Sequence, residues 1–178
     1  MYGPGGLPPG FFILGAVWRY FRDGCYTKRV KNELLKKGHP SIFDMSSYEE
    51  KLSILSEMIS LARADQEVKP PELDFLWGVA EQLGVDRTDF ETLFEAPAEN
   101  IIPKTLLERI LQFHRLVLLM NVDQGQQTFK EIDKLHNIGL RMGLPPSAID
   151  QVLALMHQYP DKVIPPKTLI GIFKAHYN

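Results

Sequence analysis

The sequence contains one cysteine, Cys25, among its 178 residues. A single thiol cannot form an intramolecular disulfide, so we expect a reducing compartment, the cytoplasm. Long hydrophobic runs are also missing. The longest uncharged apolar stretch, residues 11–18, is too short to span a membrane, which takes about 20 residues. It also lacks the basic start of a secretory signal and a convincing cleavage site.

The short motifs of common enzyme classes are absent as well. The sequence has no Gly-rich phosphate loop, no nucleophile elbow and no HExxH. Its five histidines are scattered, and none has a second His or Cys three or four residues away, as zinc sites often do. We therefore expect the histidines to be surface polar residues, and the protein to be non-enzymatic with no catalytic residues.

A strong net charge is missing too, since 20 Lys and Arg oppose 22 Asp and Glu. No global field favours nucleic acid, and we expect none as a partner. The charge is uneven, however. Residues 1–44 hold seven of the basic and three of the acidic residues, which leaves 13 basic and 19 acidic residues for 45–178. The basic segment, residues 1–44, either contacts nucleic acid or anionic lipid, docks on the acidic residues of 45–178, or is simply exposed to solvent.

Residues 1–44 read as an N-terminal extension of the domain. Residues 1–10 hold four Gly and three Pro, which is typical of flexible chain, and short helices are expected over 11–22 and 28–37. In residues 11–22 an apolar block is followed by aromatic and basic side chains, which is typical of a segment lying in a membrane interface. The alternative is a short helix packed on the domain. We assign residues 45–178 to that domain.

From Met45 onward the sequence pattern is typical of α-helices. Apolar residues recur with helical spacing, and no segment alternates with period two, so we predict an all-α domain of about seven helices. Capping boxes at Ser47/Glu50 and Thr128/Glu131 mark two helix starts. The expected helices run from Ser47 to Ala62, over 72–83, from 86 to about 94, over 104–120 and 128–142, from Pro145 to about Tyr159, and from Pro165 to His176.

The acidic part of the chain, residues 45–178, contains an internal sequence repeat. Residues 61–94 resemble residues 119–153, and residues 101–110 resemble residues 164–173. Three anchors keep the same order in both copies: Asp65-Gln66 with Asp123-Gln124, Glu72-Leu73-Asp74 with Glu131-Ile132-Asp133, and Leu83-Gly84 with Met142-Gly143. We predict two pseudo-repeats that bury their apolar faces on each other. Residues 62–76 and 121–133 each connect two helices and are rich in acids, and we call them the acidic joints. They then hold equivalent positions in the fold, although the sequence does not determine whether they lie close together.

The first joint resembles the TerB-like helical domain, a family named for bacterial tellurite resistance. The resemblance spans roughly residues 46–158 and rests on Ala64-Asp65-Gln66-Glu67-Val68, then Glu72-Leu73, then Leu83-Gly84, with a weaker copy at Val122-Asp123-Gln124-Gly125. It implies a compact all-α domain with a non-enzymatic role in stress response, acting through a protein partner or by weak divalent-cation binding.

A related domain occurs in the membrane-anchored DnaJ-like co-chaperone DjlA. That resemblance implies an alternative function, a membrane-peripheral adaptor in which residues 11–22 serve as interfacial anchor. This chain has no J-domain, since residues 38–41 lack the Asp that would complete His-Pro-Asp.

Two residues depart from the family pattern. The turn usually has Gly where this chain has Gln66 and Gln124. Because Gly permits a positive φ, we expect the local backbone to differ here. The second turn also has Gly125 where the first has the acid Glu67.

The acidic joints allow two interpretations. An EF-hand starting at Asp65 fails, because Pro70 takes the place of its glycine and Leu76 the place of its last glutamate. Another kind of site, weak and taking Ca²⁺ or Zn²⁺, would combine carboxylates of both joints if these meet: Asp65, Glu67, Glu72, Asp123 and Glu131. Alternatively, the same acids only cap helices and favour the positive ends of their dipoles.

Overall fold

The computed structural model describes residues 47–122, 127–159 and 162–177. Within them the chain forms seven α-helices and a short 3-10 turn, with no strand, which confirms the predicted all-α fold. The helices expected at 11–22 and 28–37 lie outside the described residues. The elements are α3 (Tyr48–Ala62), η2 (Arg63–Asp65), α4 (Pro70–Leu83), α5 (Arg87–Thr92), α6 (Leu106–Asn121), α7 (Phe129–Arg141), α8 (Pro146–Met156) and α9 (Pro166–His176).

The two predicted capping boxes form the expected local hydrogen bonds. Ser47 Oγ accepts from the Glu50 N–H at 3.3 Å, and Glu50 Oε2 accepts from the Ser47 N–H at 3.1 Å. The same reciprocal pair closes the start of α7 between Thr128 and Glu131, at 3.2 and 2.6 Å. Each box satisfies backbone donors that the first helical turn leaves without a partner.

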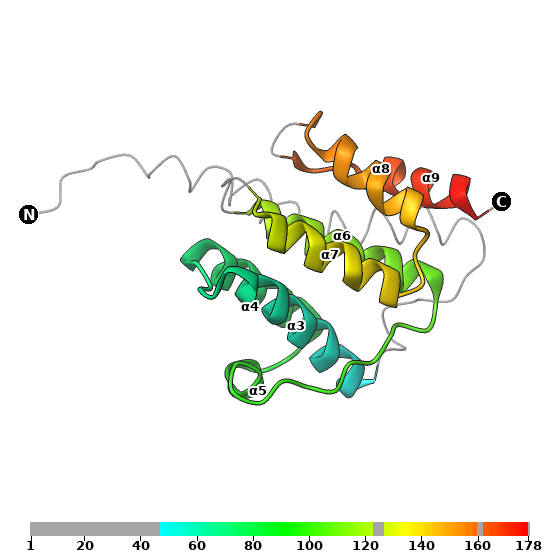
Figure 1. Ribbon diagram of the computed structural model, residues 1–178. Helices are drawn as coiled ribbons and strands as arrows, with labels where there is room; N and C mark the ends of the chain where they lie inside the picture. Colours follow the sequence, from blue (N-terminus) through cyan, green and yellow to red (C-terminus); the bar gives the residue numbers. More distant parts are fainter. Residues whose placement is uncertain (1–46, 123–126, 160–161, 178) are drawn as a thin grey trace, which may run out of the picture.

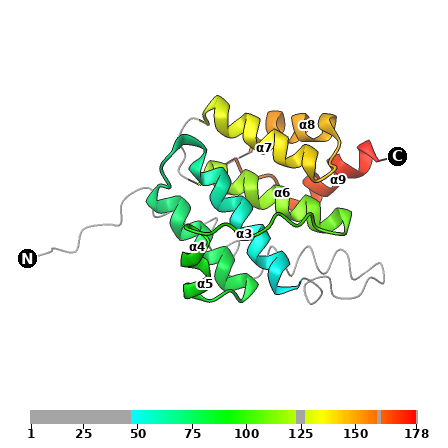
Figure 2. The same cartoon turned by 60° about the horizontal axis from the view of Figure 1, so that its bottom comes forward.

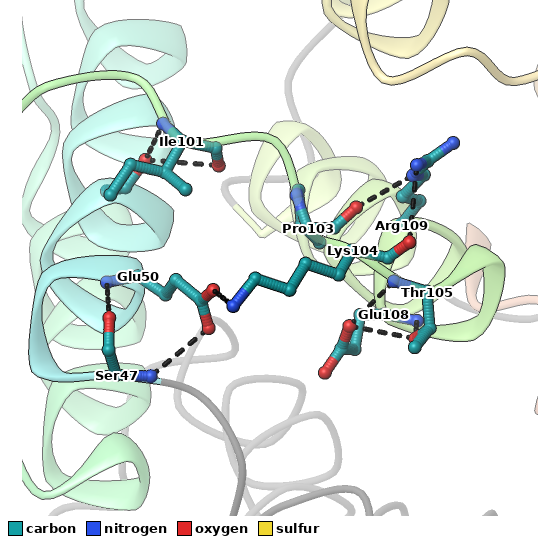
Figure 3. A network of polar contacts seen from close by, with 9 residues as sticks. Ser47, Glu50, Ile101, Pro103, Lys104, Thr105, Glu108 and Arg109 are labelled. Carbon is teal, nitrogen blue, oxygen red and sulfur yellow. Dashed lines mark hydrogen bonds and ion pairs between the residues drawn. The ribbon is translucent and has the colours of Figure 1, made fainter.

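The start of α6 was predicted wrongly. The helix begins at Leu106 rather than at Lys104, because Thr105 and Glu108 form a third capping box, with bonds of 3.2 and 2.9 Å. Arg109 then donates to the carbonyls of Pro103 and Lys104, at 2.7 and 3.3 Å (Figure 3). These acceptors therefore bind a side chain of α6 and stay outside its backbone ladder.

Two helices end earlier than expected. α5 ends at Thr92 instead of about Phe94, and α8 ends at Met156 instead of about Tyr159. In each case the last residues make tighter bonds to the third residue back, such as the Phe94 N–H to the Glu91 carbonyl at 3.1 Å. Such turns are a common way to close a helix.

α6 is the central helix of the domain. It packs against α3, α4, α7 and α9, and each residue from Ile110 to Asn121 is buried. Figure 1 shows the pairs α3–α4, α6–α7 and α8–α9 as successive layers, with α6–α7 in the middle. A helix covered on both sides buries polar positions together with apolar ones. His114 is 0 % exposed, so its predicted surface position was wrong.

The two repeat units share the order of their helices but differ in their contacts. α8 packs against both α7 and α9. Its counterpart α5 joins the domain through aromatic rings instead, with Phe90 centred 5.4 Å from Trp77 and 5.3 Å from Phe94. The short α5 thereby leaves room for the connection to α6, which crosses α3 (Figure 2).

Candidate functional site

The first acidic joint and the described part of the second, at the start of α7, lie at one end of the domain. The turn η2, which carries Asp65, packs against α7, the helix that follows the second joint. Figures 1 and 2 place the α3–α4 connection beside the start of α7, at the end opposite to the start of α6. The sequence left the proximity of the joints open. The structure brings together their described parts, while Asp123 lies outside the described residues.

The glutamates of the two joints serve as helix caps. Glu72 Oε2 accepts from the Lys69 N–H at 2.8 Å, and Glu131 Oε2 accepts from the Thr128 N–H at 2.6 Å. Both stand near the positive end of a helix dipole, which stabilises a carboxylate. The capping interpretation is therefore correct for Glu72 and Glu131.

Burial distinguishes these two caps from the others. Glu72 is 3 % exposed and Glu131 is 7 % exposed, whereas the capping glutamates Glu50 and Glu108 are only partly buried. Capping by itself does not require this, because the other two boxes work with more solvent around the carboxylate. Burying a carboxylate is costly unless other groups compensate its charge. The end of the domain that carries the joints therefore holds two buried carboxylates, whose negative charge requires compensation.

Asp65 and Glu67 complete the first joint. Asp65 Oδ2 lies 3.6 Å from Lys69 Nζ, an ion pair between the end of η2 and the residue before α4. The other carboxylate oxygen, Oδ1, is buried and has no hydrogen-bond partner among the described residues. Glu67 is exposed. Asp65 thus keeps an acceptor atom that the fold itself does not use.

The donor set can be compared with what a metal requires. Within residues 47–122, 127–159 and 162–177, no three His, Cys, Asp or Glu side chains gather closely enough to hold a metal ion. Asp65, Glu67, Glu72 and Glu131 therefore make no three-ligand group by themselves, and the five-residue site that includes Asp123 stays a prediction. All five are oxygen donors, which suit a hard cation such as Ca²⁺ better than Zn²⁺.

Gln66 takes a left-handed backbone conformation, which glycine adopts most easily. Its φ is 82° and its ψ is −12°, in the left-handed region. The turn after η2 thus has a positive φ at a residue that is not glycine. A non-glycine residue in this region is strained by roughly 1–2 kcal/mol.

Replacing Gln66 with glycine is expected to stabilise the protein. Relief of left-handed strain exceeds the extra backbone entropy that Gly loses on folding, so the net gain is about 0.5–1 kcal/mol. Urea denaturation measures it. Gln66→Ala is the matched control and should bring no gain, because alanine keeps the strain. Equal stability of both variants would contradict a strained turn.

Two apolar side chains at the joint end were missed as candidates. Phe129 is 88 % exposed in the first turn of α7, and Leu73 is 42 % exposed in the first turn of α4. In the sequence, Phe129 continues the three-residue spacing of Ile132 and Leu135 and therefore resembles a core position. Since it is the first residue of α7, the neighbouring helices do not cover it. An exposed aromatic beside carboxylates is typical of a contact surface.

Comparison with known proteins identifies the first unit. Residues 40–94 match the family TerB, described as tellurite resistance protein TerB. This segment includes α3, η2, α4, α5 and the whole first joint, while the second unit lies beyond it. No curated protein and no solved structure matched the chain. The chain is thus similar to the TerB family over this segment, and its all-helical fold agrees with that similarity.

Proposed function

We propose that this chain is a non-enzymatic interaction module of bacterial stress response, of the kind that the family's link with tellurite resistance suggests. Its functional surface is the joint end, defined here by Asp65, Glu67, Glu72 and Glu131. There it recognises a protein partner and binds a divalent cation weakly. The observation that carries the proposal is the burial of Glu72 and Glu131 at the same end of the fold.

Cation binding follows from the charge that this end concentrates. This end carries two buried carboxylates and the buried Oδ1 of Asp65, and Asp65 Oδ2 pairs with the Lys69 ammonium. A hard cation takes several oxygen atoms of this kind as ligands. Glu72 and Glu131 each keep one oxygen in a capping bond. We therefore expect weak rather than tight binding.

Partner recognition follows from the apolar residues beside these acids. Phe129 provides a large exposed ring, and Leu73 a second, half-exposed apolar contact. Interface energy concentrates in a few such anchors, while surrounding charges determine orientation and selectivity. A partner with a basic surface around an apolar pocket fits this arrangement.

Calcium titration tests the cation part. Isothermal calorimetry of the full chain should show saturable Ca²⁺ binding with a Kd on the order of 10⁻⁴–10⁻³ M, the range of weak oxygen-ligand sites. Asp65→Asn should weaken it at least fivefold. Glu81→Gln, at the far end of α4 and exposed, is the matched control and should bind as the parent does. An absence of saturable heat, or equal affinity in Asp65→Asn, would sink the cation proposal.

The membrane-peripheral adaptor stays a prediction. Its interfacial anchor, residues 11–22, lies outside the described residues. Among the residues that the structure does describe, no helix is both long and apolar enough to cross a bilayer.

A further inference from the structure

A cavity of about 300 Å³ lies beside α3. It is lined by α3, by Arg63 of η2, by the end of α5 and the connection from α5 to α6, and by α7, with apolar side chains beside the polar ones. That connection is held across α3 by the Ile101 N–H, which donates to Ser53 Oγ at 2.7 Å (Figure 3). The volume is at the lower end of the range for small-molecule sites, about 300–1,000 Å³.

Two cationic side chains, Arg63 and Lys134, line the cavity. Arg63 donates to the carbonyl of Phe94 at 2.8 Å and stacks 5.1 Å from its ring centre. Lys134 donates to the carbonyl of Ser60. Neither makes an ion pair with any residue in the described part of the chain, and each has further N–H donors. Both charges are thus held in place by neutral groups, with no ion-pair partner among the described residues.

The carboxylate of the cavity does not neutralise them. Glu57 Oε1 lies 3.1 Å from Arg141 Nη2 and accepts from Asn100 Nδ2 at 3.4 Å. Burial raises the pKa of Glu57, against the lowering effect of Arg141, so its charge is both paired and disfavoured. Burial and the nearby Arg141 charge lower the pKa of Lys134, which indicates repulsion between these cations. An anion in the cavity would relieve that repulsion.

Neutral donors complete the lining. Ser56 is buried and Ser60 is exposed, so one face of α3 brings hydroxyl groups to the wall and the rim of the cavity. Asn100 contributes an amide from the opposite side. Hydroxyl and amide donors around two cations suit the oxygens of a carboxylate or phosphate group. Since the volume leaves room beyond one such group, the ligand is larger than a bare ion.

We propose that this cavity binds a small organic anion through a carboxylate or phosphate group, with Arg63 and Lys134 as its charged partners. The site borders the joint end, since Arg63 begins η2, but it takes an anion and does not depend on the function proposed for that end. Both contacts are charge-assisted hydrogen bonds, and loss of one typically weakens binding about tenfold or more.

Calorimetric titration of the full chain at low ionic strength tests the proposal. The probes are citrate for the carboxylate group, glycerol 3-phosphate for the phosphate group, and glycerol as the uncharged control. We expect one anion to bind saturably at a single site, and glycerol not to bind. If neither anion binds saturably, the proposal is wrong.

Charge variants then locate the site. Arg63→Gln and Lys134→Gln should each weaken anion binding about tenfold. Lys130→Gln is the matched control, an exposed lysine of the same helix as Lys134 that does not line the cavity, and should change nothing. Glu57→Gln should tighten binding, because it removes a negative charge while keeping the shape. Equal weakening by Lys130→Gln, or weakening by Glu57→Gln, would overturn the assignment.

Backbone NMR of the parent chain provides a measurement that needs no variant. The amide signals of Ser56, Arg63, Asn100 and Lys134 should shift together on titration with the binding anion. Shifts that cluster elsewhere, with these four signals unmoved, would overturn the proposal even if calorimetry detects binding.

Discussion

Lowering the pH from 7 towards 4 is expected to destabilise the protein steeply through His114. This side chain is 0 % exposed in the middle of α6. Its pKa is lowered to about 3, mainly by burial and also by the nearby Arg115 charge, while a hydrogen bond with the backbone of Ile164 partly opposes both effects. The unfolded chain, by contrast, protonates His114 near pH 6.5.

The direction of the effect follows from these two pKa values. Above about pH 6.5 the imidazole is neutral in both states and adds no pH dependence. As the pH falls from there towards 3, the unfolded state binds a proton that the folded state does not. Each pH unit then lowers the free energy of unfolding by about 1.4 kcal/mol, or roughly 4–5 kcal/mol over the whole window. The raised pKa of Glu57 acts in the opposite direction and offsets part of the loss at the acid end.

Urea denaturation at a series of pH values measures this slope. His114→Gln should be less stable at pH 7, by about 1–3 kcal/mol, because it disturbs a buried polar contact. Below pH 6.5 its free energy of unfolding should nevertheless fall less steeply with pH than that of the parent. The difference in slope corresponds to nearly one bound proton, or about 1.4 kcal/mol per pH unit. His157→Gln, at an exposed histidine, is the control and should keep the parental slope. An unchanged slope in His114→Gln would show that another group causes the acid sensitivity.

Gly139→Leu is the second substitution with a large expected effect. Gly139 is buried in α7, where an added Cβ would lie 2.7 Å from Ile149 Cδ1 and 3.0 Å from Phe113 Cε2. Those atoms belong to α8 and α6, so glycine permits the close approach of three helices. A leucine must displace both side chains in a close-packed core, and we expect a loss of about 3 kcal/mol or more.

The same substitution at Gly171 is a matched control. Gly171 is also helical, but it is exposed on α9, and nothing lies within 4 Å of an added Cβ. Gly171→Leu should be neutral or stabilise by up to about 1 kcal/mol, because leucine favours the helix more than glycine does. Urea denaturation compares the two variants. Similar stabilities would contradict the close packing of α7.

Much of the fold could be predicted from the sequence because its signals are local. A capping box needs only four consecutive residues, as at Ser47 and Thr128, and glycine stops such as Gly84 depend on one backbone conformation. The start of α6 was predicted from Pro103, although the Thr105/Glu108 box was the stronger local signal. Both signals are visible in the sequence, and the error arose because the wrong one of the two was taken as the helix start.

The site depended on tertiary contacts, which the sequence does not encode locally. The spacing of Glu72 and Glu131 predicted that they cap helices, but their burial depends on the packing of η2 against α7. The apolar periodicity of Phe129 could not distinguish a covered position from the open end of a helix. His114 lacked a partner nearby in the sequence, and its partner at Ile164 lies on a connection far along the chain.

Two-dimensional NMR of the full chain during Ca²⁺ titration tests the central claim most directly. If the two joints form one functional end, amide signals of Asp65, Glu67 and Glu72 should shift along with those of Thr128 and Glu131. All of them should follow one saturation curve, and Asp65→Asn should weaken the response of both joints. Shifts confined to one joint, or spread evenly over acidic residues of the whole surface, would contradict the account.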